Sequence, residues 1–249
     1  MPELLGLPYS PWSEKARWAL DVRRVPYRFR HYQPLLGEPA LRWKLRRFKG
    51  RVTVPVLTTD DGQVLADSAD IARWADGRGD GPVLFPAEHE DAMTRFIALS
   101  DHGLAAGRAL SLERMLVDDE ALAELVPRGM RHVPLAVRMA EMGVRRTVRK
   151  YEADKASTGE HRRALRGALD EVRAALSRAV SPGPRTLLGR FSFADIAVTQ
   201  MLIAVEPPSS GLKLGAGSRR CFLDPELREA YGDLVAWRDE LYAEYRSLS

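Results

Sequence analysis

The sequence predicts an α/β domain in the order βαβ–ββα followed by an all-helical region, and three observations support this fold class. The first 80 residues hold short apolar segments, separated by a helix signature and a reverse turn. From about residue 88 onwards, apolar residues recur with the period of a helix. Between the two parts lies a connector rich in glycine and proline. We therefore predict a first domain over residues 1–80, a linker over 81–87 and a helical domain over 88–249.

The first helix is predicted to begin at Pro11, after a short N-terminal strand. Ser10 suits the N-cap because its hydroxyl can accept a hydrogen bond from a backbone amide that has no partner within the helix, and proline suits the first helical position. Such a helix end attracts anions. Ser10 and Ser13 are therefore candidate contacts for a thiolate, a phosphate or a carboxylate.

The spacing of apolar residues gives this helix one predicted buried face. The apolar side chains that share it are Trp12, Ala16, Ala19 and Leu20. The charged side chains of the same segment are expected to face solvent: Glu14, Lys15, Arg17 and Asp21.

Three further strands and two helices complete the predicted first domain. Residues 25–32 alternate apolar and basic positions and suit a strand, and a short helix with an irregular loop follows over 35–50. Residues 54–57 open a third strand, the turn at 60–62 reverses the chain, and 63–66 return as a fourth strand. Because proline has no amide hydrogen, Pro55 belongs at the start of its strand or at a bend, where its peptide bond can also be cis. A second helix follows Asp67 and Ser68.

The helical region is predicted to contain five helices, over residues 88–117, 135–152, 160–180, 193–206 and 225–245. Ser192 and Asp195 form a capping box at the start of the fourth, which gives both residues a structural role. The single cysteine, Cys221, is expected in a loop near the end of the chain.

Composition excludes several classes of function. One cysteine rules out an intramolecular disulfide, a CxxC redox pair and a zinc site built from several cysteines, so any thiol chemistry must come from a ligand. The five histidines lack ligand spacing, and we expect no metal. No apolar run is long enough to span a membrane and the first residues do not resemble a signal peptide, so we expect a cytoplasmic protein.

The net charge of +4 does not by itself imply nucleic acid. Basic residues gather over 128–166, where we expect solvated helix faces because aromatic residues for base stacking are missing. A surface for an acidic partner or a nucleic acid is the alternative interpretation of this region.

The chain resembles the cytosolic glutathione transferases over most of its length. Five features carry the resemblance in the family's order: Ser10-Pro11-Trp12-Ser13 with Lys15 to Leu20, Val54-Pro55-Val56-Leu57, Asp67-Ser68 followed by Ile71, Leu84-Phe85-Pro86, and Leu188 to Asp195. The serine places the motif with the tau-, theta- and zeta-like classes. The resemblance implies a thioredoxin-like first domain that binds glutathione and a helical domain that supplies most of the pocket for a second substrate.

The resemblance assigns Ser10 to activation of the glutathione thiol, since a hydroxyl that donates to the thiolate lowers the pKa of the thiol. Tyr9 is a rival hydroxyl, and a plain helix cap is the alternative role of Ser10. Val54, next to a cis Pro55, would meet the cysteinyl backbone of glutathione. Ser68 would bind the γ-glutamyl carboxylate and Asp67 the ammonium, although the family more often has Glu or Gln where this chain has Asp67. The glycyl carboxylate would meet one of three cations: Lys44, Lys49 or Arg51.

The resemblance also implies a pocket for the second substrate and a homodimer. Candidate pocket residues come from both domains: Tyr9, Trp12, Leu36, Asp101, His102, Gly103 and Met115. The dimer interface would involve Phe85 or helix residues near Met93. The implied function is conjugation of glutathione to a small, largely apolar electrophile, as in detoxification. A non-catalytic ligand- or partner-binding protein of the same family is the alternative, as is a glutathione-dependent peroxidase, isomerase or dehalogenase.

Overall fold

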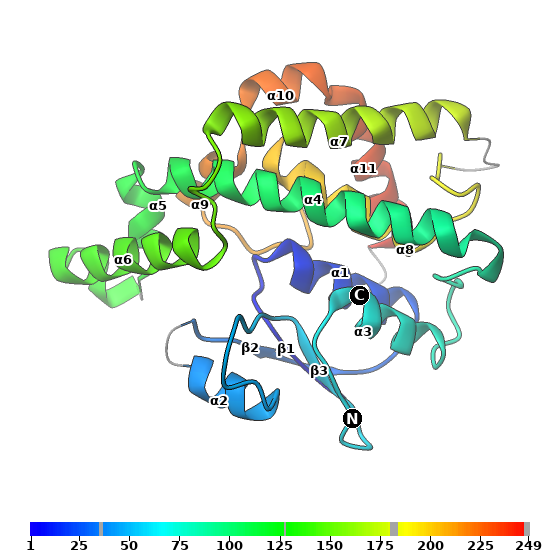
Figure 1. Cartoon of the computed structure of the whole chain (residues 1–249), viewed down its shortest axis with the longest axis horizontal. Helices are drawn as coiled ribbons and strands as arrows, with labels where there is room; N and C mark the ends of the chain where they lie inside the picture. The colour runs from blue at the N-terminus through cyan, green and yellow to red at the C-terminus, as the bar shows by residue number, and fades with distance from the viewer. Residues whose placement is uncertain (35–36, 127, 180–183, 247–249) are drawn as a thin grey trace.

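The computed structural model describes residues 1–34, 37–126, 128–179 and 184–246 (Figure 1). Its first part is a four-stranded mixed sheet with helices on both faces, and its second part is helical. This arrangement confirms the predicted fold class. No helix in the described ranges is long and apolar enough to cross a membrane.

The sheet has the order β2-β1-β3-β4. Its strands are β1 (Glu3–Gly6), β2 (Arg28–His31), β3 (Val56–Thr58) and β4 (Val64–Leu65). β1 is parallel to β2 and antiparallel to β3, and β4 is antiparallel to β3. The first part also contains three helices: α1 (Pro11–Val22), α2 (Glu38–Lys44) and α3 (Ser68–Asp76).

Alternation along the strands separates two small cores. Leu4 and Leu57 pack with residues of α1 and α3 on one face of the sheet. Leu5 and Val56, each one residue away along its strand, pack with Leu41 of α2 on the other face. The cis Val54–Pro55 peptide bond immediately precedes β3, so the proline stands before the ladder, where its missing amide leaves no gap.

The helical part is built around two long neighbouring helices and one buried short helix. Its elements are η1 (Ala87–His89), α4 (Glu90–Met115), α5 (Asp119–Glu124), η2 (Arg128–Met130), α6 (Pro134–Lys150), α7 (Thr158–Arg178), α8 (Phe193–Thr199), η3 (Gln200–Ala204), α9 (Ala216–Phe222), α10 (Pro225–Ala230) and α11 (Gly232–Tyr245). α4 and α7 lie side by side (Figure 1), and every residue of α8 is buried. Asp195 accepts hydrogen bonds from the amides of Ser192 (2.9 Å) and Leu187 (2.8 Å), which confirms its structural role at the start of α8.

Four predictions for the helical part are corrected by the structure. The helix that begins at Phe193 changes to a 3₁₀ helix at Gln200 and does not continue as an α-helix to residue 206. The last predicted helix is interrupted at Tyr231 and forms α10 and α11. The short helices α5 and α9 were not predicted, because six or seven residues are too few to show a period. Cys221 is buried in α9, and burial raises its pKa to about 11, so the thiol is protonated near neutral pH.

Arg23 binds the connector between the two parts. Its buried guanidinium donates to the carbonyl of Asp76 (2.8 Å) and to the carbonyls of Gly79 and Gly81. The Asp76 carboxylate in turn accepts from the amide of Leu84 (2.8 Å), at the start of the Leu84-Phe85-Pro86 motif. The connector therefore follows a defined path, while the division into domains at 80 and 88 stays a prediction.

The expected solvent exposure of Glu14 and Lys15 is wrong, because α1 lies between two layers (Figure 1). One side of α1 packs on the sheet and α3, and the other packs on α8 and η3. Both charges are buried and paired with the helical part: Glu14 Oε1 lies 2.6 Å from Arg246 Nε, and Lys15 Nζ lies 2.8 Å from Asp101 Oδ1. Arg17 and Asp21 are half-buried.

We expect Arg246→Ala to destabilise the protein by about 2 to 4 kcal/mol. Among the described residues, the change leaves the buried Glu14 carboxylate with Arg17 as its one ionic partner, and the loss of one partner of a buried pair typically costs about 3 to 5 kcal/mol. The measurement is the midpoint of urea unfolding. Arg163→Ala, an exposed arginine of α7, is the control and should change the unfolding free energy by less than about 0.5 kcal/mol. Equal midpoints for the two variants would contradict the prediction.

Candidate active site

The strand register brings Ser10, Pro55 and Ser68 together at one end of the sheet, where β1 and β4 end and β3 begins. Leu5 of β1 pairs with Val56, so the chain leaves the C-terminal end of β1 toward Ser10 beside the start of β3. Leu57 of β3 pairs with Leu65, so the chain leaves β4 toward Ser68 at the same end. Three segments far apart in sequence therefore converge there, and α1 and α3 both begin at this end.

Ser10 caps α1 and keeps a hydrogen to donate. Its Oγ accepts from the amide of Ser13 at 3.5 Å, as predicted for an N-cap. A hydroxyl has one donor and two acceptor sites, so capping leaves the O–H free for a ligand. Ser13 is completely buried and its Oγ accepts from the amide of Leu7 (3.0 Å), which gives it a structural role.

Val54, Asp67 and Ser68 offer polar groups next to Ser10. Among the described residues, no backbone hydrogen bond uses the amide or carbonyl of Val54. Asp67 is the N-cap of α3, where its Oδ1 accepts from the amide of Ala69 at 2.7 Å, and its second oxygen remains for a cation. Ser68 is buried at the first position of α3, where backbone amides favour an anion.

The three cations proposed for the glycyl carboxylate differ in their surroundings. Lys44 is occupied, since its Nζ donates to Thr58 Oγ1 (2.9 Å) and lies 3.8 Å from Glu3. Lys49 is exposed. Arg51 is also exposed, but its guanidinium lies over the ring of Tyr151, 5.5 Å from the centroid, and the chain runs from it directly to Val54. Of the three, Arg51 is the best placed for this role.

The candidate second-substrate residues divide into a group beside α1 and a group elsewhere. Trp12 is half-buried, and its Nε1 donates to Asp101 Oδ1 (3.1 Å), the same oxygen that Lys15 approaches. Tyr9 is half-buried just before Ser10, and burial raises its pKa, so its hydroxyl stays protonated near neutral pH and can donate a hydrogen bond. His102 is exposed on α4.

Two of the candidate pocket residues lie in cores, and a third cannot be placed. Gly103 is buried where a Cβ would collide with the sulfur of Met201, so close packing accounts for the glycine. Met115 is buried in a small core with residues of α5 and α9, which makes a pocket role for it wrong. Leu36 lies outside the described residues.

Sequence reasoning missed Arg108 and Tyr151. The guanidinium carbon of Arg108 lies 4.7 Å from the ring centroid of Trp12 and 3.7 Å from that of Tyr151. Arg108 follows Asp101 by seven residues on α4, so the two share a helix face, and this spacing was the signal that could have found it. Tyr151 stands at the end of α6, and only the packing of that helix against α4 brings it here.

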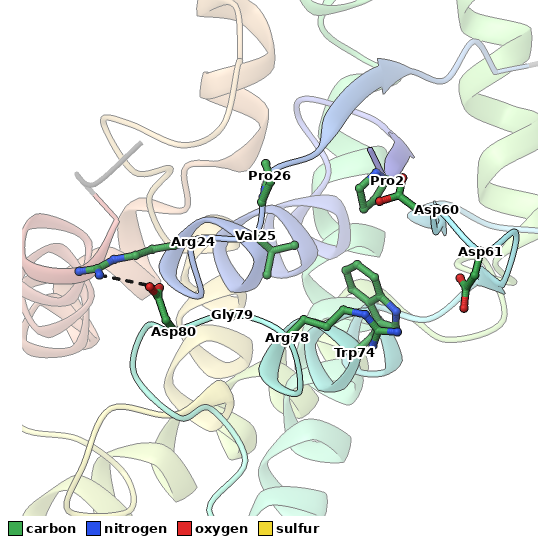
Figure 2. Close-up of a pocket in the computed structure, with 10 residues that line it drawn as sticks. All are labelled: Pro2, Arg24, Val25, Pro26, Asp60, Asp61, Trp74, Arg78, Gly79 and Asp80. Carbon is green, nitrogen blue, oxygen red and sulfur yellow. Dashed lines mark ion pairs between the residues drawn. The ribbon is translucent and has the colours of Figure 1, made fainter.

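Two pockets lie at different ends of the first part. One of about 420 Å³ is formed by α2, Gly50 and Arg51 on one side and the end of α6 on the other. The larger, of about 620 Å³, is lined by Arg24, Asp61 and Trp74 among others (Figure 2). It lies at the C-terminal ends of α1 and α3, one helix length, or about 18 Å, from Ser10. The larger pocket is therefore separate from the candidate site.

The basic region over 128–166 is partly neutralised within the chain. Arg162 and Arg166 of α7 pair with Glu226, and Arg162 also pairs with Asp224. These contacts do not favour a nucleic-acid surface on α7. Among the described residues, no group of three acidic, histidine or cysteine side chains is close enough to hold a metal ion.

Comparison with known proteins agrees with this geometry. Residues 9–78 match the family described as the glutathione S-transferase N-terminal domain. A curated relative, a probable glutathione S-transferase of Solanum tuberosum, is 32% identical over 110 residues, which make up 43% of this chain and 49% of the relative. The match thus spans about half the length of that relative.

Solved structures match the chain over nearly its whole length. A glutathione S-transferase from Methylobacillus flagellatus, with GSH bound, has a TM-score of 0.60 at 20% identity and covers 100% of this chain and 99% of its own. Glutathione transferase GSTFuA2 from Phanerochaete chrysosporium has a TM-score of 0.65 at 17% identity, covering 98% and 97%. A glutathione S-transferase from Ceriporiopsis subvermispora, in complex with glutathione, has a TM-score of 0.62 at 19% identity, covering 99% and 95%. These low identities show a shared fold, and over residues 9–78 the chain resembles the glutathione S-transferase N-terminal domain.

We expect Asp101→Asn to destabilise the protein by about 2 kcal/mol at pH 7 and by less than about 1 kcal/mol at pH 10. Burial lowers the pKa of Lys15 from its ordinary 10.5, and Asp101 opposes that shift. Because the unfolded chain holds this proton more tightly, stability rises with pH between the lowered pKa and 10.5. Without Asp101 the pKa of Lys15 falls further, so the fraction of neutral Lys15 is larger at pH 10 than at pH 7, and the neutral amine needs no anionic partner.

The measurement is the difference in unfolding free energy between variant and native protein at each pH. Glu240→Gln, on an exposed site of α11, is the control and should show no difference at either pH. A deficit for Asp101→Asn that is the same at pH 7 and pH 10 would show that the charge of Lys15 is not involved.

Proposed function

We propose that the protein is a glutathione transferase that joins the glutathione thiolate to a small, largely apolar electrophile. The observation that carries the proposal is the convergence of the Ser10 hydroxyl, the Val54 backbone and the start of α3 at one end of the sheet. Bound glutathione in several structural neighbours supports glutathione as the co-substrate. Their low identity leaves activity as the matter to be tested.

In this proposal the first domain binds and ionises glutathione. The hydroxyl of Ser10 donates to the sulfur and the N-terminus of α1 adds its dipole, and both stabilise the thiolate over the thiol. Ser68 and the amides of α3 hold the γ-glutamyl carboxylate, and the free oxygen of Asp67 takes the ammonium. Val54 meets the cysteinyl backbone and Arg51 the glycyl carboxylate. No protein sulfur is required, which agrees with a single buried cysteine far along the chain.

The alternative is a family member that binds glutathione or another ligand without turnover. The protein's own hydrogen bonds do not exclude it, because a Ser10 that only caps α1 would have the same contact to Ser13. The thiol pKa of bound glutathione separates the two functions. The homodimer stays a prediction; Phe85 is half-buried and stacks on Phe193, and Met93 itself lies in the core.

We expect Ser10→Ala to raise the thiol pKa of bound glutathione by about 1 to 2 pH units, since a hydrogen bond to a charged group is worth about 1.5 to 3 kcal/mol. The affinity for glutathione should change little at a pH where the thiol is protonated. The thiol pKa is measured from the ultraviolet absorption of the thiolate as a function of pH, and the affinity by isothermal titration.

Ser157→Ala is the matched control, because Ser157 caps α7 as Ser10 caps α1. It should lose helix-cap stability and leave the thiol pKa of bound glutathione unchanged. Native protein that fails to bind glutathione, or binds it with an ordinary thiol pKa, would overturn the transferase proposal. An equal effect of the two substitutions would assign Ser10 to capping alone.

We expect Arg51→Ala to weaken glutathione binding about tenfold. The affinity for the glycyl monoethyl ester of glutathione, which native protein should bind more weakly than glutathione, should be the same in the variant and in native protein. The ester lacks the carboxylate that the guanidinium would hold, so arginine removal costs it nothing. Lys44→Ala is the control, and its cation is already paired with Glu3 and Thr58. Titration calorimetry of both ligands with all three proteins measures this. A larger loss for Lys44→Ala would move the role to that residue.

A further inference from the structure

Arg108 is a half-buried cation that forms no ion pair with a described residue. Its guanidinium carbon stands 3.7 Å from the ring centroid of Tyr151 and 4.7 Å from that of Trp12, and its Nε is buried without a hydrogen-bond partner. Within the described ranges, no carboxylate forms an ion pair with it. Asp101, seven residues earlier on α4, is already engaged by Lys15 and by Trp12. Cation–π contacts with the rings of Trp12 and Tyr151 therefore take the place of an ion pair.

Two further cations lie near the ring of Tyr151. Arg51 lies 5.5 Å and Lys150 Nζ 5.8 Å from the centroid of the Tyr151 ring. Both line the 420 Å³ pocket, together with Arg149. In the part of the chain that the structure describes, none of these cations forms an ion pair.

The acid that lines this pocket is Glu38, and two other cations already occupy it. Glu38 Oε1 lies 2.7 Å from Arg42 Nη2, and its Oε2 lies 3.1 Å from Arg146. The site therefore keeps an uncompensated positive charge.

Holding these cations together without an anion costs free energy. Burial lowers the pKa of Arg108 to about 10, and burial together with neighbouring arginines lowers the pKa of Lys150. Cation–π contacts recover only part of the lost hydration of a guanidinium. An anionic ligand that displaces the remaining water would supply the missing partner, and a planar ligand would also pack against the rings of Trp12 and Tyr151.

We propose that the second substrate is an organic anion, a planar apolar electrophile that carries a carboxylate, and that Arg108 binds this carboxylate between Trp12 and Tyr151. The inference rests on the proposed transferase function and names the substrate class of its site. Trp12 follows Ser10 by two residues, so a ligand on its ring lies beside the start of α1, where the thiolate would be. Arg108 comes from α4 and Arg51, assigned to glutathione itself, from the segment before β3, although both guanidinium groups lie near the ring of Tyr151.

A chloronitrobenzoate illustrates the reaction. The glutathione thiolate forms a carbon–sulfur bond at the ring carbon that bears chlorine, the carbon–chlorine bond breaks, and chloride leaves with the electron pair. The thiol proton has already passed to solvent. The carboxylate takes no part in bond making, so Arg108 would act by binding and orienting the substrate.

The test compares a carboxylate with its neutral ester. We would titrate native protein and Arg108→Met with two conjugates, S-(4-carboxy-2-nitrophenyl)glutathione and its aryl methyl ester, and measure kcat/KM for the matching electrophiles, 4-chloro-3-nitrobenzoate and its methyl ester. The variant should bind the carboxylate conjugate about 10- to 100-fold more weakly and lose a similar factor in kcat/KM for the benzoate. Both ester values should stay within about threefold of native. Unliganded Arg108→Met should be at least as stable as native protein, since the substitution removes an uncompensated charge.

Arg95→Met, a change of an exposed arginine on the same helix, is the control and should alter neither ligand's affinity. Arg108→Lys, which keeps the charge, should restore part of the discrimination. Equal losses for acid and ester, or a destabilised Arg108→Met that loses glutathione as well, would overturn the inference and leave the transferase function standing. Tight, Arg108-dependent binding of the acid without turnover would sink the transferase proposal alone, and failure of native protein to bind either conjugate would overturn both.

Discussion

The burial of α1 between the sheet and the helical part is the constraint on which the rest of the structure depends. A helix with one solvated face could carry Glu14 and Lys15 at no cost, but α1 has no such face at these positions. Each charge must be met from the other layer, so Asp101 of α4 and Arg246 at the end of α11 become fixed relative to α1. The same contacts hold the start of α1 against α4. Because Arg108 lies two turns beyond Asp101, the pairing that neutralises Lys15 also sets the position of Arg108 relative to Ser10.

Local chemistry predicted the parts of the fold and site that depend on a few adjacent residues. The cap at Ser10 and the Ser192–Asp195 pair are each specified by one or two side chains and the backbone beside them, and the sequence therefore predicted them. The helix start after Asp67 was also predicted, and a cis bond was one of the two placements that the sequence allowed for Pro55. The prediction failed where burial comes from elements distant in the sequence. The spacing of apolar residues in α1 indicates one buried face and says nothing about a second layer. Met115 was expected in a pocket and lies in a core for the same reason, since α5 and α9, which cover it, are too short to leave a period.

Two residues of the candidate site cap helices and still have hydrogen-bonding groups that no atom of the described residues uses. Ser10 Oγ accepts one hydrogen bond, and Asp67 gives one of its two oxygens to the backbone, so each retains the group that a ligand would need. A capping serine and a thiol-activating serine are thus compatible descriptions of one side chain. The contrast with Ser13 shows what a purely structural hydroxyl looks like here: it is fully buried and accepts the amide of Leu7. The two serines therefore differ in their position and burial: Ser10 is half-buried at the end of the sheet where α1 begins, and Ser13 is completely buried.

The chain between α4 and α7 is where this protein could acquire its own substrate preference. That segment forms α6, whose last turn and cap bring Arg149, Lys150 and Tyr151 against α2 and against Arg108. Most groups assigned to glutathione come instead from the end of the sheet and the starts of α1 and α3, whereas Arg51 lies over Tyr151 and would connect the two sides of the site. Stability does not explain this group of mutually repelling cations, because removing one of their charges should stabilise the unliganded protein. Its presence is explained if the ligand that completes the site is negatively charged.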